Sequence, residues 1–130
     1  MQAKLPNFFS FETAKDLIRI GKQNDGGYLV SKSDIHNSDC LIGLGISDDW
    51  SFESDFVKIN NTPVFAYDAS VNTKFWLKKF VINTLKNPFK LSDSFKFISY
   101  KKFFTGNRKH IKKFVGLNTD DSNYCTLSSI

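Results

Sequence analysis

Two glycines and one aspartate occupy positions from which they could bind a small-molecule cofactor. Gly43 and Gly45 lie in the apolar run 40–46. A first glycine there lets the chain turn sharply, and a second lets the backbone approach a ligand without an intervening Cβ. Asp68 follows the next apolar run, where doubly wound folds place a carboxylate that accepts hydrogen bonds from ribose hydroxyls. The three residues predict a nucleoside-type ligand; the alternative is that the glycines serve a tight turn and Asp68 caps a helix beginning near Asn72.

The residue three positions after Gly45 narrows the choice of nucleoside. A dinucleotide-binding turn has a third glycine there, whereas this chain has Asp48, whose carboxylate would repel a pyrophosphate. The Gly-Lys-Ser or Gly-Lys-Thr of a phosphate-binding loop is also missing from the sequence. A cationic nucleoside without phosphates fits better. S-adenosylmethionine, with its amino group and sulfonium, is such a ligand and is the cofactor we predict.

The elements that position these residues alternate between strand and helix. The apolar run 40–46 is typical of a parallel strand buried on both faces. Capping residues at 47–49 and apolar positions at helical spacing predict a helix of about a dozen residues after it. A second strand over 64–67 and a second helix over 73–85 follow. This order predicts an α/β domain with a parallel sheet.

The two ends of the chain allow alternatives. Residues 10–21 read as a helix, but a turn signal at 24–27 predicts a hairpin that needs part of the same segment. Segments 95–100 and 110–117 could both be strands, and one of them would be the third parallel strand. We expect a single domain, in which a helix or hairpin extension precedes a partial cofactor-binding domain; the boundary divides 1–37 from 38–130.

Charge is distributed unevenly along the chain. Residues 74–113 contain twelve basic side chains and one acidic side chain, whereas the preceding 73 residues have a net negative charge. The aromatic residues between these lysines resemble the stacking platforms of nucleic-acid-binding proteins, so one alternative is a non-catalytic module that contacts nucleic acid or an acidic glycan. A solvated helix face explains the charge, and core packing explains the aromatics. We favour this second interpretation and expect no nucleic-acid partner.

Several protein classes are excluded by simpler features. The apolar stretches are too short for a transmembrane segment, and the N-terminus has no apolar core of a signal peptide. Cys40 and Cys125 lack companion spacing and are interpreted as free thiols of a cytoplasmic protein. No His, Cys and Asp cluster has metal-ligand spacing, so we expect no metal site. His36 and His110 are interpreted as surface residues, which leaves the catalytic base unknown.

Four segments resemble, in order and spacing, the methyltransferase-like proteins allied to the FkbM family. These segments are 19–21, 25–30, 44–53 and 65–70. Such proteins are similar to S-adenosylmethionine-dependent O-methyltransferases. The resemblance implies a Rossmann-like methyltransferase fold, of which this chain is the N-terminal part of the doubly wound sheet. It also implies methyl transfer to a sugar or another small hydroxyl acceptor.

The resemblance assigns a role to each candidate site residue. Gly43 and Gly45 would lie under the methionine portion of the cofactor, and Asp68 would hold the ribose. Asp48 would meet the amino group, directly or through water. Ala69 would lie close to the adenosine.

In the family, a strand with an Asp-x-Glu-Gly motif follows a Thr-Leu segment that residues 126–130 resemble. This chain ends at Ile130, so we expect a truncated methyltransferase, whose activity as this fragment is uncertain. The first strand is central in a doubly wound sheet. Truncation would therefore expose 41–46 as an apolar edge, which predicts self-association.

Overall fold

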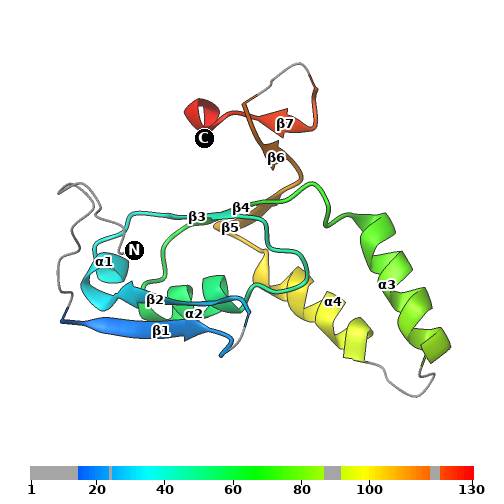
Figure 1. Ribbon diagram of the computed structural model, residues 1–130, viewed down its shortest axis with the longest axis horizontal. Helices are drawn as coiled ribbons and strands as arrows, with labels where there is room; N and C mark the ends of the chain where they lie inside the picture. Colours follow the sequence, from blue (N-terminus) through cyan, green and yellow to red (C-terminus); the bar gives the residue numbers. More distant parts are fainter. Residues whose placement is uncertain (1–14, 24, 87–91, 118–120) are drawn as a thin grey trace, which may run out of the picture.

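The chain folds into a mixed α/β domain around a parallel sheet (Figure 1). The computed structural model describes residues 15–23, 25–86, 92–117 and 121–130. Three strands form the central sheet in the order β3-β4-β5: β3 is Leu41–Leu44, β4 is Val64–Tyr67 and β5 is Arg108–Ile111. Both strand pairs are parallel. The predicted parallel α/β sheet is thus confirmed.

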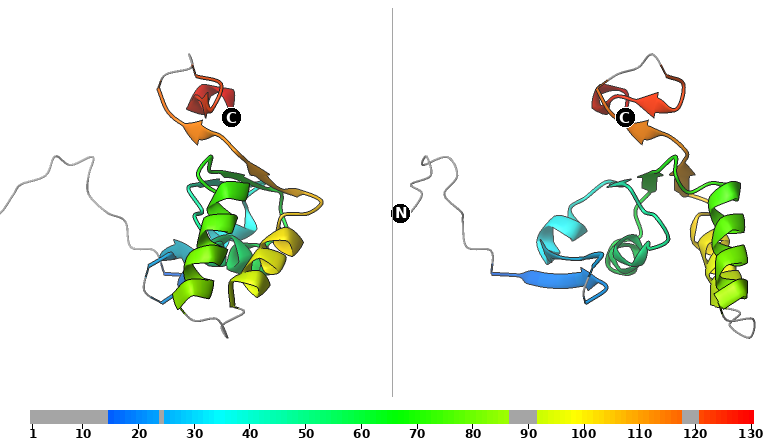
Figure 2. Two further views of the ribbon diagram at one scale, coloured as in Figure 1. Left: turned by 90° about the vertical axis from the view of Figure 1, so that its right-hand side faces the viewer. Right: turned by 45° about the vertical axis from the view of Figure 1, so that its right-hand side comes forward.

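Three helices lie on the same side of this sheet (Figures 1 and 2). They are α2 (Ser51–Ile59), α3 (Thr73–Lys86) and α4 (Ser92–Phe103). Val64 and Ala66 of β4 are fully buried, because alternate residues of a strand point to the same face and this face packs on the helices. Ala66 joins a core cluster that includes Trp50, Trp76 and Tyr100. The helices predicted after each of the first two parallel strands are both confirmed.

The N-terminal segment forms a hairpin rather than the competing helix. Strand β1 (Leu17–Gly21) pairs antiparallel with β2 (Gly27–Ser31), and the short helix α1 (Lys32–His36) follows. Gly21 and Gly26 have positive φ angles, which glycine adopts without strain. Ile20 packs with Ile35 and Phe56, and this second cluster attaches the hairpin to α2. Of the proposed helix 10–21, residues 10–14 lie outside the described residues.

Of the two strands predicted in the later part of the chain, the first is wrong, whereas the second is confirmed in part and contributes to the third parallel strand. Segment 95–100 is not a strand but part of α4, where Phe97 and Tyr100 pack against Trp76. Their three-residue spacing also suits one face of a helix, so packing decided between the two patterns. Segment 110–117 is two strands: β5 ends at Ile111, and β6 (Phe114–Val115) pairs with β7 (Tyr124–Cys125) in a separate sheet. A 3-10 helix, η2 (Leu127–Ser129), follows.

Strand β3 forms one edge of the sheet, as predicted for residues 41–46. Among the described residues, no strand pairs with its outer edge. Ile42 and Leu44 point away from the helices and are 45% and 57% exposed. The exposed apolar edge is confirmed, and self-association through it stays a prediction. No helix in the described part of the chain has the length and apolar character needed to span a membrane.

Candidate nucleoside site

A cavity of about 640 Å³ opens at the carboxyl ends of β3 and β4. Strand β6 and helix η2 line its other side, beyond the end of the sheet (Figure 2). Gly45 and Asp68, both predicted as site residues, line it together with Leu44 and Tyr67. The other predicted site residues, Gly43, Asp48 and Ala69, do not line this cavity. The volume lies within the usual range for small-molecule sites.

Gly45 presents bare backbone to the cavity. Its φ is +83°, and a Cβ built on it would have no atom within 4 Å. The following turn continues in the left-handed region at Ser47, whose φ is 45°. The amide of Gly45 donates to the carbonyl oxygen of Tyr67 over 2.9 Å, which fixes the turn to the end of β4. The glycine thus keeps space free for a ligand, as the sequence predicted for a close backbone approach.

Asp68 connects the ends of the two strands. Its Oδ2 accepts hydrogen bonds from the amides of Ile46 (3.0 Å) and Ser47 (2.9 Å). Its Oδ1 accepts from the amide and the hydroxyl of Ser70. Burial opposes ionisation of this carboxyl, but the hydrogen bonds outweigh it and hold its pKa below the ordinary value. Asn72, rather than Asp68, accepts from the first turn of α3, through the amide of Phe75.

His110 is not the surface residue that the sequence suggested. It is half-buried, and its ring joins Tyr100 to the backbone at Asp68. A carbonyl oxygen only accepts, so Nε2 carries the proton that bonds Asp68 O over 2.8 Å. Nδ1 of the neutral ring then accepts from the Tyr100 hydroxyl over 2.5 Å. Burial lowers the pKa of His110, which favours this neutral form.

Asp48 points to a different part of the molecule from the one predicted. Its carboxylate forms ion pairs with Lys79 of α3 and Lys96 of α4. These lysines belong to the basic segment 74–113, called the Lys-rich segment below, so part of its charge is neutralised within the fold. The sequence signal for Asp48 was its distance from Gly45, which does not specify the direction of a side chain. Pairing with both helices turns this carboxylate away from the cavity.

Two other carboxylates lie beside the glycine turn and were missed by sequence reasoning. Asp49 and Glu53 line a cavity of about 290 Å³, which shares Leu44 and Gly45 with the larger one. Asp49 also pairs with Lys22 over 2.7 Å. Asp49 lies two residues before α2 and Glu53 lies in its first turn, so their separation of four residues could have suggested that they lie close together.

The side chain of Glu53 lies directly over Gly43. A Cβ at Gly43 would lie 2.9 Å from Oε1 of Glu53, closer than ordinary contacts allow. Glu53 is only 7% exposed. Burial raises its pKa; its own backbone amide opposes this, and the negative charge of Asp49 raises the pKa further. Gly43 therefore accommodates a buried carboxyl, a role different from the predicted contact with a methionine portion.

The substitution Glu53→Gln is expected to stabilise the protein at pH 7, on the order of 1 kcal/mol, a usual scale for a favourable single change. A raised folded pKa means that Glu53 contributes stability below its ordinary value of 4.5, which is lost as pH rises through the folded pKa. Urea unfolding at pH 4 and pH 7 should thus show that the stability gained by Glu53→Gln over wild type is larger at pH 7. An equal difference at both values would contradict the explanation. Asp55→Asn should have the opposite sign at pH 7, because Lys58 and the Gly21 amide lower the Asp55 pKa.

The aromatic residues of the Lys-rich segment are partly used in the core. Trp76, Tyr100 and Phe103 are each at most 9% exposed, so they offer little surface for stacking on bases. Within the described ranges, no group of three or more His, Cys, Asp or Glu side chains could hold a metal ion.

Comparison with known proteins gives no match of any kind. No protein-family model, no curated protein and no solved structure matches this chain. The functional argument therefore depends on the residues and on the geometry of the site.

Proposed function

We propose that this chain is the cofactor-binding part of an S-adenosylmethionine-dependent methyltransferase with a Rossmann-like fold. The observation that carries the proposal is the cavity at the carboxyl ends of the parallel strands, where Gly45 exposes backbone and Asp68 lies at the end of β4. In open parallel sheets, ligands bind outside the carboxyl ends of the strands. The methyl acceptor would be a sugar or another small hydroxyl compound.

The carboxylates around the glycine turn suit a cationic nucleoside. Asp49 and Glu53 lie in the cavity that meets the larger one at Leu44 and Gly45, and they would attract the amino group of the cofactor. This role replaces the one expected of Asp48. The same negative charge disfavours a phosphate-bearing ligand.

The ribose would bind at Asp68 if one of its hydroxyls replaced one of the hydrogen-bond donors that the Asp68 carboxylate now has. Three of the four donors to its carboxylate are backbone amides, which are fixed by the turn. The fourth is the hydroxyl of Ser70, which can rotate away. A ribose hydroxyl donating to Oδ1 would take its place and leave the three amide bonds intact.

Gly45 and Asp68 would hold S-adenosylmethionine in this cavity, and its sulfonium would supply an activated methyl group for transfer to a hydroxyl oxygen. The contribution of this chain is positioning, which is a large part of catalysis in such a transfer. Gly45 allows close approach, and the amide bonds to Asp68 hold the turn in one geometry.

Calorimetric titration with S-adenosylhomocysteine tests the proposal. We expect saturable binding, and no binding of ATP or NAD at the same concentrations, because the carboxylates repel phosphates. The variant Gly45→Ala would place a methyl group in the open cavity and should weaken binding by about tenfold or more, equivalent to ~1.4 kcal/mol. A folded chain that does not bind S-adenosylhomocysteine would overturn the proposal.

Gly106→Ala is the matched control. Gly106 also has a positive φ, of +64°, and a Cβ there would also have no atom within 4 Å. It does not line the cavity. Both alanines therefore introduce comparable backbone strain, about 1–3 kcal/mol, and only Gly45→Ala should change the affinity.

A further inference from the structure

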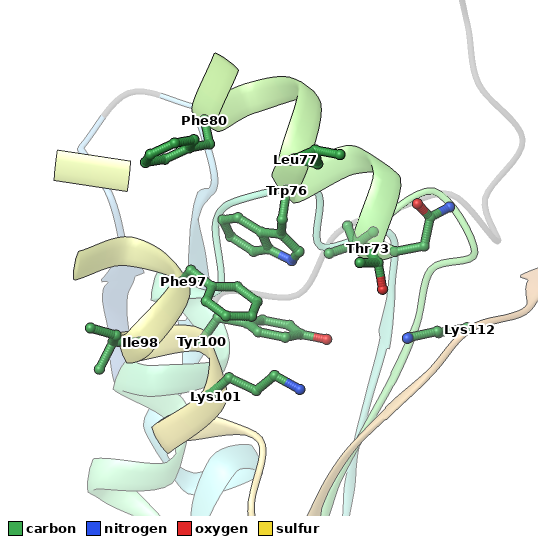
Figure 3. Close-up of a pocket in the computed structure, with 11 residues that line it drawn as sticks. Thr73, Trp76, Leu77, Phe80, Phe97, Ile98, Tyr100, Lys101 and Lys112 are labelled. Carbon is green, nitrogen blue, oxygen red and sulfur yellow. The ribbon is translucent and has the colours of Figure 1, made fainter. Parts of the chain in front are cut away.

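A second cavity lies between α3 and α4, separate from the nucleoside site (Figure 3). Its volume is about 440 Å³, and it shares no lining residue with the nucleoside cavity. Its walls are mostly apolar, formed by side chains such as Val71, Trp76, Leu77, Phe97 and Ile98. This size and lining are typical of sites for small, largely apolar ligands.

One wall carries a buried polar group without a partner. Trp76 is 8% exposed, and its indole nitrogen has no hydrogen-bond acceptor among the described residues. Figure 3 shows this nitrogen on the edge of the ring that faces the space between Thr73 and Tyr100. An unpaired buried donor costs free energy, which an acceptor on a ligand would recover. The Tyr100 hydroxyl donates to His110 and forms no hydrogen bond with this nitrogen.

The same cavity is basic at one end. Lys101 and Lys112 come from α4 and from the segment after β5, and both line the cavity. Figure 3 shows their ammonium groups pointing into the same space beside Tyr100. Neither lysine forms an ion pair with a carboxylate in the part of the chain that the structure describes. Lys101 contacts the ring of Phe97, with its nitrogen 5.7 Å from the centroid. Two cations thus border an apolar cavity without a carboxylate partner among the described residues.

We propose that this cavity binds a small carboxylate with an apolar body. The carboxylate lies between Lys101 and Lys112, where it satisfies both charges. The apolar body packs against Trp76 and Phe97. One oxygen of the same carboxylate accepts the hydrogen bond from the Trp76 indole. The site is independent of the proposed cofactor, because the two cavities have different linings.

The binding test uses 2-naphthoate and decanoate, which share the carboxylate and differ in the body, against the neutral 2-naphthylmethanol. It is performed without nucleoside. Absence of carboxylate binding therefore does not count against the methyltransferase proposal, and absence of S-adenosylhomocysteine binding does not count against this one. We expect at least one of the two carboxylates to bind, and the alcohol to bind about tenfold more weakly than 2-naphthoate. Binding should weaken as salt increases, because the lysines are exposed. The better of the two carboxylates identifies an aromatic or an alkyl body.

Neighbouring lysines provide matched controls. Lys101→Gln and Lys112→Gln should each weaken carboxylate binding about fivefold, whereas Lys102→Gln and Lys113→Gln, which remove the same charge outside the cavity, should leave it unchanged. All four side chains are exposed, so the variants are expected to fold. Equal losses in the four variants, equal binding of the alcohol, or no carboxylate binding would overturn the proposal.

The Trp76 indole provides a further readout. Its N–H resonance, assigned with a Trp76→Phe variant, should move downfield when 2-naphthoate binds, because a new acceptor lengthens and polarises the bond. The indole resonance of Trp50 serves as an internal control, since Trp50 does not line the cavity. Binding that moves neither resonance would place the ligand elsewhere and overturn the assignment of this cavity.

Discussion

Asp68→Ala is expected to lower the free energy of unfolding by about 3–5 kcal/mol, the scale of breaking a buried hydrogen-bonded network around a charge. The alanine leaves the amides of Ile46, Ser47 and Ser70 without their acceptor, and these amides fix the turn after β3. Each buried donor that loses its partner costs about 1–3 kcal/mol. Urea unfolding followed by circular dichroism measures the loss.

Acid titration gives an independent check on Asp68. Its folded pKa is lowered, so its contribution to stability is present above the ordinary value of 3.8 and is lost as pH falls through the folded pKa. The difference between wild type and Asp68→Ala should therefore shrink below pH 3.8. Asp34→Asn, an exposed change on α1, should stay within about 0.5 kcal/mol of wild type. A loss at Asp68 no larger than at Asp34 would contradict the interpretation of Asp68 as the connection between strand ends.

Gly27→Ala is expected to destabilise the protein by about 3 kcal/mol or more, at the upper end of the cost of overpacking. A Cβ at Gly27 would lie 1.8 Å from the carbonyl oxygen of Lys22, which is backbone and cannot move without opening the hairpin. The register between β1 and β2 depends on the close approach of the two strands at the turn, where Gly21 pairs with Gly27. The hairpin in turn places Ile20 against α2. Thermal and urea unfolding measure the effect.

Gly106→Ala separates this clash from the general cost of replacing a glycine. The alanine at 106 meets no atom within 4 Å, so only the strain of its positive φ remains, about 1–3 kcal/mol. Gly27 does not have a positive φ, so its cost would be steric. A Gly27→Ala protein more stable than Gly106→Ala would show that the hairpin closes in another way.

The periodicity of the sequence was sufficient to predict the central elements. Strands β3 and β4 and helices α2 and α3 follow from apolar runs and helical spacing, because local burial patterns are properties of neighbouring residues. Segment 95–100 was predicted wrongly because Phe95 and Phe97 alternate as in a strand. Phe97 and Tyr100 have helical spacing, and their packing on Trp76 selects the helix. The sequence also left open whether residues 17–21 form a helix or a hairpin strand. In the structure they form a strand, from which Ile20 packs against Phe56.

For the candidate site, the sequence by itself located Gly45 and Asp68 at the ends of adjacent parallel strands, since strand order along the chain brings those ends together. Only the tertiary structure decided the direction of each side chain. Asp48 turns to Lys79 and Lys96, and Glu53 fills the space over Gly43. The physical reason is that charge pairing and burial depend on partners from distant segments, which spacing along one chain does not specify.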